Sequence, residues 1–444
     1  MANKTKKATE VNDNNDVVEY DANGDVKLPK DRFFDPWRIA ERDGLKAVVH
    51  EAIRMVTNYE RHSGLRQRAR KPADQKIFEE TVEAVICDMI FVHLSGELRG
   101  SAVTLSNSVL GTKSRYRSSV FSKQLPSILR AMSSPEMAFI RMEVGWQKNF
   151  GNRGQRTLIW PAWRTAKRIE EHGICLMDIG RRQLRELIVL KSPKHDYWDE
   201  SEYEDYDDTD LIIRMRNQMI EINEWLKSAD IAIAEPVLAA RTQISDRSLR
   251  RVFTRGSFES GGRLFGGFWQ QMKKEHRLDY IAIDDEGVIG LDFGQMAVRT
   301  AYGIAKAKPP EGDLYQIADY LPVYRDGIKK LFNSLLSSQK PLSRKPKGTR
   351  DLLPPYPLSK LIEDISAKHP ALAPLFFTAA CHQLQFQESQ IMVEVLLRLK
   401  RVGVVGLPIH DGLVVRCDAE DVAREIMEIV ALEYTGVDIP VSTE

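Results

Sequence analysis

The sequence contains no run of 18 or more consecutive apolar residues, the length that a membrane-spanning helix needs. Its polar beginning, MANKTKKATEVNDNND, lacks the apolar segment of a secretory signal peptide. We therefore expect a cytoplasmic protein without membrane partners. The four cysteines, Cys87, Cys175, Cys381 and Cys417, show no CxxC or Cys/His spacing, so neither a zinc site nor a disulfide framework is indicated.

An excess of charge of one sign is also missing, because the formal net charge is +1. The global balance hides strong local asymmetry: RHSGLRQRARKP (61–72) is strongly basic, whereas nine of the fifteen residues in 196–210 are acidic. The overall charge therefore neither supports nor excludes a polyanionic partner. A chain of 444 residues, 43% hydrophobic and 29% charged, is typical of a globular protein with two or three packed units.

Composition and periodicity divide the chain into five regions. Residues 1–30 are expected to be a disordered tail, and 31–193 a mainly helical domain. The acidic run 194–210 is expected to be a flexible linker or mobile loop and the main boundary. Residues 211–278 would supply connecting helices and a basic loop rich in glycine and aromatic residues, and 279–444 a compact α+β domain.

Within the first domain, the order of helix (SKQLPSILRAM), strand (MAFIRMEVG), basic tip (WQKNFGNRGQ) and strand (RTLIWP) is that of a winged helix. In that interpretation the helix enters a major groove, and Lys148, Arg153 and Arg156 contact phosphates. A small α+β support with a solvated loop explains the same order equally well. Both interpretations stay open at this point.

The segment GGRLFGGFWQQMKKEHR combines glycines, aromatic residues and cations. Aromatic rings can stack on bases, and Arg263 or Arg277 could hold a phosphate. The alternative is a turn-rich loop with Phe265 and Trp269 buried. The two interpretations have equal weight.

Two aspartates are each predicted at the end of an apolar strand. DYIAIDDEGVIGLDFG indicates a strand, a turn and a second strand that ends at Asp292, and GVVGLPIHDGLVVRC places Asp411 at the tip of a later hairpin. Either could be only a helix cap or a turn residue. Brought side by side in one sheet, two such carboxylates can bind two Mg²⁺ ions and support in-line attack of a hydroxyl on phosphorus.

Between the aspartates, a predicted helix carries Arg325, Lys329 and Asn333 at intervals of four residues, which places all three on one face. Such a face could hold the triphosphate of a nucleotide, Arg325 by bidentate bonding and Lys329 as a point charge. A solvated helix face is the alternative.

These segments resemble a known family. Asp292-Phe-Gly-Gln-Met-Ala-Val-Arg299 is similar to motif A of the family A DNA polymerases, RDGIKKLFN to their fingers helix, and PIHDGLVV to motif C. Gly412 stands where DNA polymerases have Glu and single-subunit phage RNA polymerases have Ser. The resemblance covers about residues 240–444 and looks closest to plasmid and phage polymerase-like proteins.

The resemblance implies an α+β right-hand palm, an antiparallel sheet with flanking helices, together with helical fingers. Asp292 and Asp411 would bind two Mg²⁺ ions, with Mn²⁺ as a substitute, and His410 would brace the primer end. On the nucleotide side the resemblance implies roles for Arg325, Lys329, Gln295 and Ala297, with Asn333 on the same helix face, and on the nucleic-acid side for Arg299 and for Gln387 or Glu388. The basic residues suggested above without the resemblance, Arg263, Arg277, Lys148 and Arg153, would join the nucleic-acid side.

Three departures from the family pattern matter. The motif A Glu that excludes a ribose 2′-hydroxyl is Ala297, so the sugar gate looks open. No equivalent of the fingers Tyr-Gly follows Lys329, and Ser337 stands near its expected place. No set of exonuclease acids is discernible upstream, so proofreading is not expected.

We therefore expect a monomeric, template-directed nucleotidyltransferase of plasmid or phage replication that extends a DNA or RNA primer on a DNA template. It would use dNTPs or NTPs, could act as a primase, and could work with a replicative helicase or initiator. Two alternatives remain: a single-subunit RNA polymerase, or a DNA-binding replication initiator whose palm is inactive.

Overall fold

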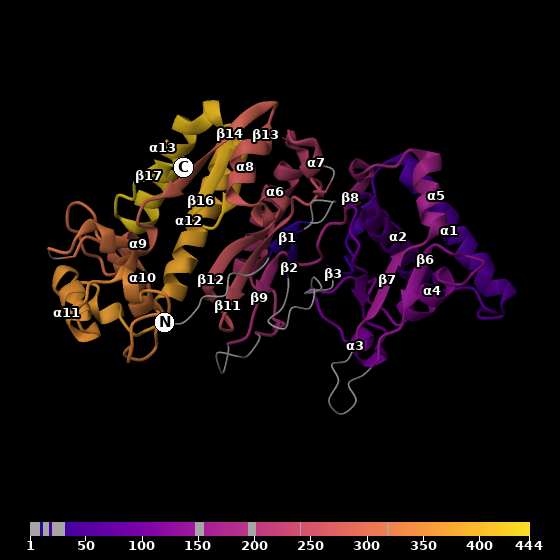
Figure 1. Ribbon diagram of the computed structural model, residues 1–444, viewed down its shortest axis with the longest axis horizontal. Helices are drawn as coiled ribbons and strands as arrows, with labels where there is room; N and C mark the ends of the chain where they lie inside the picture. The colour runs from indigo at the N-terminus through magenta and orange to yellow at the C-terminus, as the bar shows by residue number, and fades with distance from the viewer. Residues whose placement is uncertain are drawn as a thin grey trace. The chain divides into compact units, whose positions relative to one another are not determined.

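The computed structural model describes residues 9–11, 17–19, 32–146, 155–193, 201–239, 241–317 and 319–444 (Figure 1). The chain forms two compact units, one made of residues 1–113 and 118–182, the other of 114–117 and 183–444. In the segment expected to be a disordered tail, strand β1 (Thr9–Val11) pairs with β2 (Val17–Glu19), and the other residues up to 31 lie outside the described part.

The division between the units falls after residue 182, not in the acidic run that the sequence suggested as the boundary. The described part of that run, residues 201–210, belongs to the second unit. Arg115 binds Asp205 (Nε–Oδ1 2.7 Å) and Asp208 (Nη1–Oδ1 3.0 Å), and Arg216 binds Asp208 (2.8 Å). Because arginines neutralise these carboxylates, the segment packs against its own unit instead of repelling itself into a linker.

The first unit is built around two long helices, α1 (Asp43–His62) and α2 (Pro72–Leu94). Pro72 suits the first turn of α2 because that turn has no partner for its N–H group. The other elements complete the unit: β3 (Arg32–Phe33), β4 (Arg38–Ala40), β5 (Ser101–Val103), α3 (Asn107–Gly111), α4 (Leu125–Met132), β6 (Ile140–Glu143), β7 (Thr157–Pro161), α5 (Trp163–His172) and β8 (Ile179–Arg181).

The sheet of the first unit has the strand order β3-β5-β7-β6, in which β3 is parallel to β5 and the other pairs are antiparallel; β4 and β8 form a separate pair. The predicted sequence of helix, strand, tip and strand is present as α4, β6 and β7. Residues 147–154 of its tip, among them Lys148 and Arg153, lie outside the described residues. Groove entry by α4 stays a prediction.

The second unit contains a six-stranded sheet with the order β10-β13-β14-β16-β15, and β17 pairs with β14. All of its pairings are antiparallel. The strands are β10 (Ile231–Ile233), β13 (Ile281–Ile283), β14 (Glu286–Phe293), β15 (Gly406–Ile409), β16 (Gly412–Arg416) and β17 (Val441–Thr443). The fold is therefore mixed α+β, and the C-terminal strand β17 joins the sheet.

A smaller sheet, β12-β11-β9, consists of β9 (Ile188–Leu190), β11 (Leu249–Thr254) and β12 (Ser257–Gly266). The expectation of a glycine-aromatic loop is wrong for residues 261–266, which belong to β12. Gly261 and Gly262 have positive φ angles of 78° and 83° beside an irregularity in the β11–β12 register. They permit a bulge, and a Cβ at Gly262 would lie 2.7 Å from Ser389 Oγ, so glycine lets a helix approach the strand.

That helix is α12 (Cys381–Arg401), which runs along β12 (Figure 1). Helix α6 (Asp210–Ser228), expected to be thumb-like or connecting, buries its apolar side in the same core as the sheet. A separate core joins α9 (Met296–Ile304), α10 (Arg325–Ser337) and α11 (Leu358–Lys368). The remaining helices are α7 (Pro236–Ala239), α8 (Lys274–Tyr280) and α13 (Glu420–Thr435). No described helix is long and apolar enough to cross a membrane.

Candidate functional site

Asp292 and Asp411 lie side by side in the larger sheet of the second unit. Strands β14 and β16 are antiparallel, and their register places Asp292 opposite Gly412, the residue after Asp411. A Cβ at Gly412 would lie 3.3 Å from Asp292 Oδ1 and 3.2 Å from the carbonyl oxygen of Leu291. Glycine at 412 therefore leaves the space in which the two strand-end carboxylates meet.

The hairpin between β15 and β16 holds Asp411 at its tip. Ile409 pairs with Gly412, and the two residues between them make the turn. His410 has a φ angle of 58°, a left-handed conformation that a residue with a Cβ adopts rarely. The turn is braced from β15, because Trp269 Nε1 (3.0 Å) and Gln270 Nε2 (2.9 Å) both donate to the Pro408 carbonyl.

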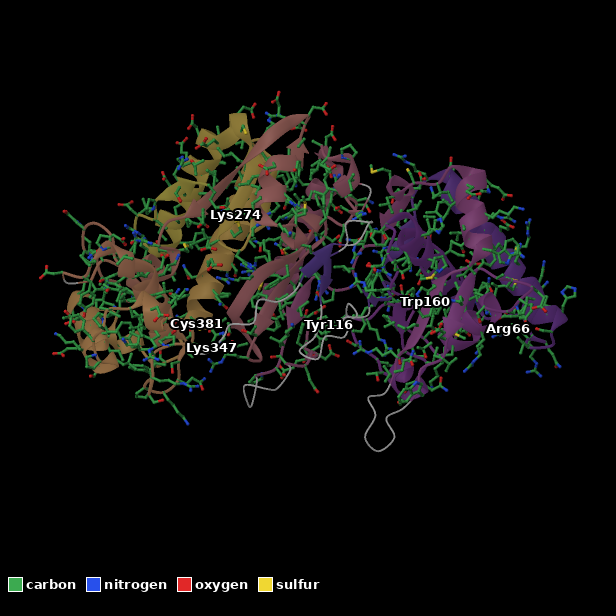
Figure 2. The ribbon with its side chains drawn as sticks, in the orientation of Figure 1. Arg66, Tyr116, Trp160, Lys274, Lys347 and Cys381 are labelled. Atoms are coloured by element: carbon green, nitrogen blue, oxygen red, sulfur yellow. The ribbon has the colours of Figure 1, made fainter. Side chains whose placement is uncertain are left out.

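The charge of the pair is poorly compensated. The pKa of Asp292 is raised to about 6, first by partial burial and then by the negative charges of Asp411 and Glu444; Lys329 and Lys274 oppose the rise. Lys274, labelled in Figure 2, is itself bound to Glu444 (Nζ–Oε1 2.9 Å). A pair that repels itself in this way favours the arrival of a cation.

The cationic helix predicted from the sequence is α10, and its three polar residues differ in what they contact. Arg325 is engaged by Asp313 (Nη2–Oδ1 3.4 Å, with a closer contact from Nε) and its guanidinium carbon lies 5.5 Å from the centre of the Tyr315 ring. Lys329 is exposed, and its charge reaches Asp292. The buried Oδ1 of Asn333 has no hydrogen-bond partner among the described residues.

Asn333 faces a small cavity of about 180 Å³ that also includes Ala297. The polar and small residues around it come from β12, α9, α10 and α12: Arg263, Ala297, Asn333, Ser337, Gln385 and Glu388. Cys381, at the start of α12 and labelled in Figure 2, lies on the same wall. The position that the sequence marks as an open sugar gate therefore borders empty space.

Arg263 and Glu388 form a bidentate ion pair at this cavity, with distances of 2.7 Å and 2.8 Å. Burial nevertheless raises the pKa of Glu388 to about 7, and the negative charges of Asp411 and Asp292 add to the rise. Both members of the pair thus lie within the electrostatic field of the strand-end carboxylates. Of the two residues that the resemblance suggests on this helix, Glu388 lines the cavity, whereas Gln387 Nε2 donates to the Tyr434 carbonyl of α13 (2.8 Å).

Three further predicted residues are engaged with the chain itself. Gln295 has a positive φ angle (59°), and its Oε1 accepts from the Leu314 N–H group (3.1 Å). Arg299 donates to the Asp438 carbonyl (2.8 Å) and Arg277 to the Trp269 carbonyl (3.2 Å). In this conformation they brace backbone segments around the site.

A groove of about 400 Å³ runs from Arg263 over the outer face of the β9–β11–β12 sheet. Its polar and aromatic lining is Lys191, Tyr203, Arg250, Arg263, Phe265 and Gln385. Phe265, which the alternative interpretation expected to be buried, is 40% exposed, and its ring centre lies 5.7 Å from that of His410. The groove therefore begins beside the carboxylate pair.

Sequence reasoning missed Lys191, Arg250 and Gln385. The signal for Arg250 was present, because Leu249, Arg251 and Phe253 are buried while Arg250, Val252 and Thr254 are not. This period of two predicts a strand with one face outward. For Lys191 and Gln385, we find no local signal, because only tertiary structure brings them to the groove.

Comparisons with known proteins give little beyond this geometry. No family model matches the chain, and no curated protein matches it. Among solved structures, the chain is similar to the POL domain of Pol1 from M. smegmatis, in complex with a DNA primer-template and dNTP, at 9% identity and a TM-score of 0.32. The match covers 92% of this chain and 66% of that one, and a score this low does not establish a shared fold.

Proposed function

We propose that this protein is a template-directed nucleotidyltransferase that adds nucleotides to a primer by a two-metal mechanism. The observation that carries the proposal is the pair Asp292 and Asp411, set side by side by the β14–β16 register. A structural role would leave such a pair compensated by cations of the chain. Here neither carboxylate forms an ion pair with a described residue.

The carboxylate oxygens of Asp292 and Asp411 suit Mg²⁺ if water and substrate phosphates complete its coordination shell. Among the described residues there is no group of three or more His, Cys, Asp or Glu side chains arranged to hold a metal. Mg²⁺ commonly binds through one or two carboxylates, with the rest of its shell from water and substrate phosphates. Two ions held in that way activate the attacking hydroxyl and neutralise the leaving pyrophosphate.

The chain's own groups would position the substrates. Lys329 would meet the triphosphate as a point charge, and Arg325 would do so after sharing or exchanging its contact with Asp313. His410 and Phe265, whose rings meet edge to face, would support the primer end. The groove with Arg263, Arg250 and Lys191 would take the nucleic-acid backbone.

The cavity beside Ala297 supports acceptance of ribonucleotides. A methyl group at this position leaves room and does not desolvate a 2′-hydroxyl against a carboxylate. We expect incorporation of NTPs as well as dNTPs, which would allow synthesis of primers. Ala297→Glu should lower the use of NTPs relative to dNTPs by roughly tenfold. Strict use of dNTPs by the wild-type protein would contradict this part of the proposal.

The central test is extension of a labelled primer-template with Mg²⁺ or Mn²⁺. Asp411→Asn should reduce incorporation by roughly 10² to 10³-fold, since it removes one charge from the site that stabilises the transition state. Asp418→Asn is the matched control, because Asp418 follows the other end of β16 and binds Arg416. Equal incorporation by Asp411→Asn and the control would overturn the metal assignment.

The same assay separates the alternatives. Absence of incorporation under every combination of nucleotide and metal, with DNA binding intact, would indicate a non-catalytic initiator. A product that depends on a promoter and needs no primer would indicate a single-subunit RNA polymerase.

A further inference from the structure

A second cavity lies in the first unit, at the base of the β6–β7 hairpin. Its volume is about 550 Å³, within the range of roughly 300 to 1,000 Å³ typical of ligand sites. Most of its wall is apolar, from β3, β5 and the segment after β5. The aromatic residues that line it are Phe33, Phe34, Phe121 and Trp146.

Two of these rings are exposed at the cavity although they are large and apolar. Phe33 is 66% exposed and Trp146 is 47% exposed. Phe34, by contrast, is buried and meets Phe121 edge to face with ring centres 6.0 Å apart. The cavity thus has a packed aromatic floor and two aromatic faces available to a ligand.

Both exposed rings are held in place before any ligand arrives. The guanidinium of Arg156 lies 4.7 Å from the centre of the Phe33 ring. Trp146 Nε1 donates to Gln155 Oε1 (3.0 Å), and the backbones of the two residues exchange hydrogen bonds of 3.0 Å. Gly145 allows this close hairpin, since a Cβ there would lie 2.2 Å from the Gln155 carbonyl oxygen. Preorganised rings bind a flat group at low entropic cost.

The positive charge in and around the cavity lining indicates which kind of ligand the cavity can bind. Arg156 is the one charged residue among the described residues that line it. Basic residues also outnumber acidic ones between positions 32 and 182. A ligand with a flat apolar face and a negative charge fits this lining better than an apolar peptide does.

We propose that this cavity binds an unpaired base of a single-stranded nucleic acid, stacked on Phe33 or Trp146, with a neighbouring phosphate on Arg156. A duplex hides the faces of its bases in the stack and cannot offer them to the rings. The site is distinct from the Asp292–Asp411 pair and does not depend on its activity. It would hold a single strand outside the catalytic unit.

The test uses the full-length protein without nucleotides and measures its affinity for a labelled single strand and for the same sequence as a duplex. Phe33→Ala and Trp146→Ala should each weaken single-strand binding about tenfold, the loss typical of removing one aromatic–base stack. Their effect on the duplex should be small. Arg156→Gln should reduce the slope of log affinity against log salt by about 0.7, the value for one phosphate contact with a single strand.

Trp163→Ala is the matched control. Trp163 is 58% exposed, and the guanidinium of Arg164 lies 4.7 Å from its ring, as Arg156 does from Phe33, but Trp163 does not line the cavity. Photocrosslinking with a 5-iododeoxyuridine strand adds a direct readout, and we expect the modified peptides to contain Phe33 or Trp146.

Unchanged affinity of the Phe33→Ala/Trp146→Ala double variant, with crosslinks confined to the second unit, would overturn the proposal. A change in oligomeric state of this double variant without a change in affinity would also overturn it, because the rings would then seat another copy of the chain. Loss of primer extension in Asp411→Asn has no bearing on either result. The two proposals can therefore fail separately.

Discussion

A buried aspartate of the first unit and a half-buried pair of aspartates in the second unit differ in how the fold compensates their charge. In the first unit, the fully buried Asp88 accepts hydrogen bonds from Arg32 (Nη1–Oδ2 2.9 Å), from Arg38 and from Ser101 (2.8 Å). Both guanidiniums also face the ring of Phe91, at 5.3 Å and 3.8 Å from its centre. In the second unit, Asp292 lies opposite Gly412, the residue after Asp411, and neither aspartate forms an ion pair with a described residue.

This difference is the one expected between a structural carboxylate and the ligand-binding carboxylates that we propose. The electrostatic demand of Asp88 is already met inside the fold, so that residue has little left to offer a substrate. The pair in the second unit keeps an unmet demand for positive charge, which the raised pKa of Asp292 reports. The amount of positive charge around an acidic residue therefore distinguishes the two cases better than the burial of that residue does.

The largest effect on stability is expected at Asp88. Asp88→Ala leaves the guanidiniums of Arg32 and Arg38 without their common partner and should lower the free energy of unfolding of the first unit by about 3 to 5 kcal/mol. Chemical denaturation followed by circular dichroism measures it. Asp74→Ala, an exposed acid in the first turn of the same helix, should change stability by less than about 0.5 kcal/mol. Similar losses of unfolding free energy in both variants would contradict the interpretation of Asp88 as a structural carboxylate.

In contrast to Asp88→Ala, Asp292→Asn should not destabilise the metal-free protein, because it removes a like-charge repulsion. It should remove the stabilisation that Mg²⁺ gives the wild type, which is about 2.7 kcal/mol at a hundredfold excess over the dissociation constant. Thermal unfolding with EDTA and with Mg²⁺ checks both statements. If Mg²⁺ stabilises Asp292→Asn as much as the wild type, the ion binds elsewhere.

Glu388 is intermediate between Asp88 and Asp292 in charge compensation, because it forms an ion pair with a single arginine, Arg263. Burial raises the pKa of Glu388 to about 7 in spite of Arg263, so the charged form of this side chain gains little from the fold. Glu388→Gln should therefore cost only about 1 kcal/mol, since the amide can still accept from Arg263. Arg263→Met, which leaves Glu388 without its cation, should cost more. Chemical denaturation at pH 7 measures the free energy of unfolding of both variants. A larger loss in Glu388→Gln than in Arg263→Met would mean that Glu388 is a structural carboxylate like Asp88.

The sequence predicted the strands at the site better than the surroundings of the site. The alternation around Asp292 and the hairpin around Asp411 are local signals, and β14, β15 and β16 confirm them. That the two ends meet followed only from a family resemblance, because nothing local specifies the pairing of strands more than a hundred residues apart. The sequence identifies Gly412 as a turn residue, but it does not show that the missing side chain leaves space beside Asp292 Oδ1.

The misjudged regions share a physical cause, which is compensation from distant parts of the chain. The acidic run looks self-repelling until Arg115, some ninety residues earlier, binds Asp205. Residues 261–266 look like part of a loop because glycines usually punctuate turns, whereas here Gly262 lets β12 approach Ser389 of α12. Likewise, Gln387 and Glu388 are neighbours on one helix, and only the packing of α13 and β12 decides which of them faces the site.

The smallest effect is expected in the pH dependence of stability, and its sign follows from the raised pKa values. Asp292 (about 6) and Glu388 (about 7) hold their protons more tightly in the folded protein than in the unfolded chain, where carboxyl groups titrate near 4. Between pH 4 and pH 7 the folded state therefore holds more protons on these two groups, and their contribution to the stability of the metal-free second unit falls as pH rises. Thermal unfolding in EDTA at pH 5 and pH 7.5 should show this fall as a difference between variants: Asp292→Asn should gain stability relative to the wild type as pH rises, whereas Asp418→Asn should not. Mg²⁺ should reverse the fall at pH 7.5, because a cation between the carboxylates favours their charged form. An equal pH dependence in Asp292→Asn would mean that the pair is compensated after all, as Asp88 is.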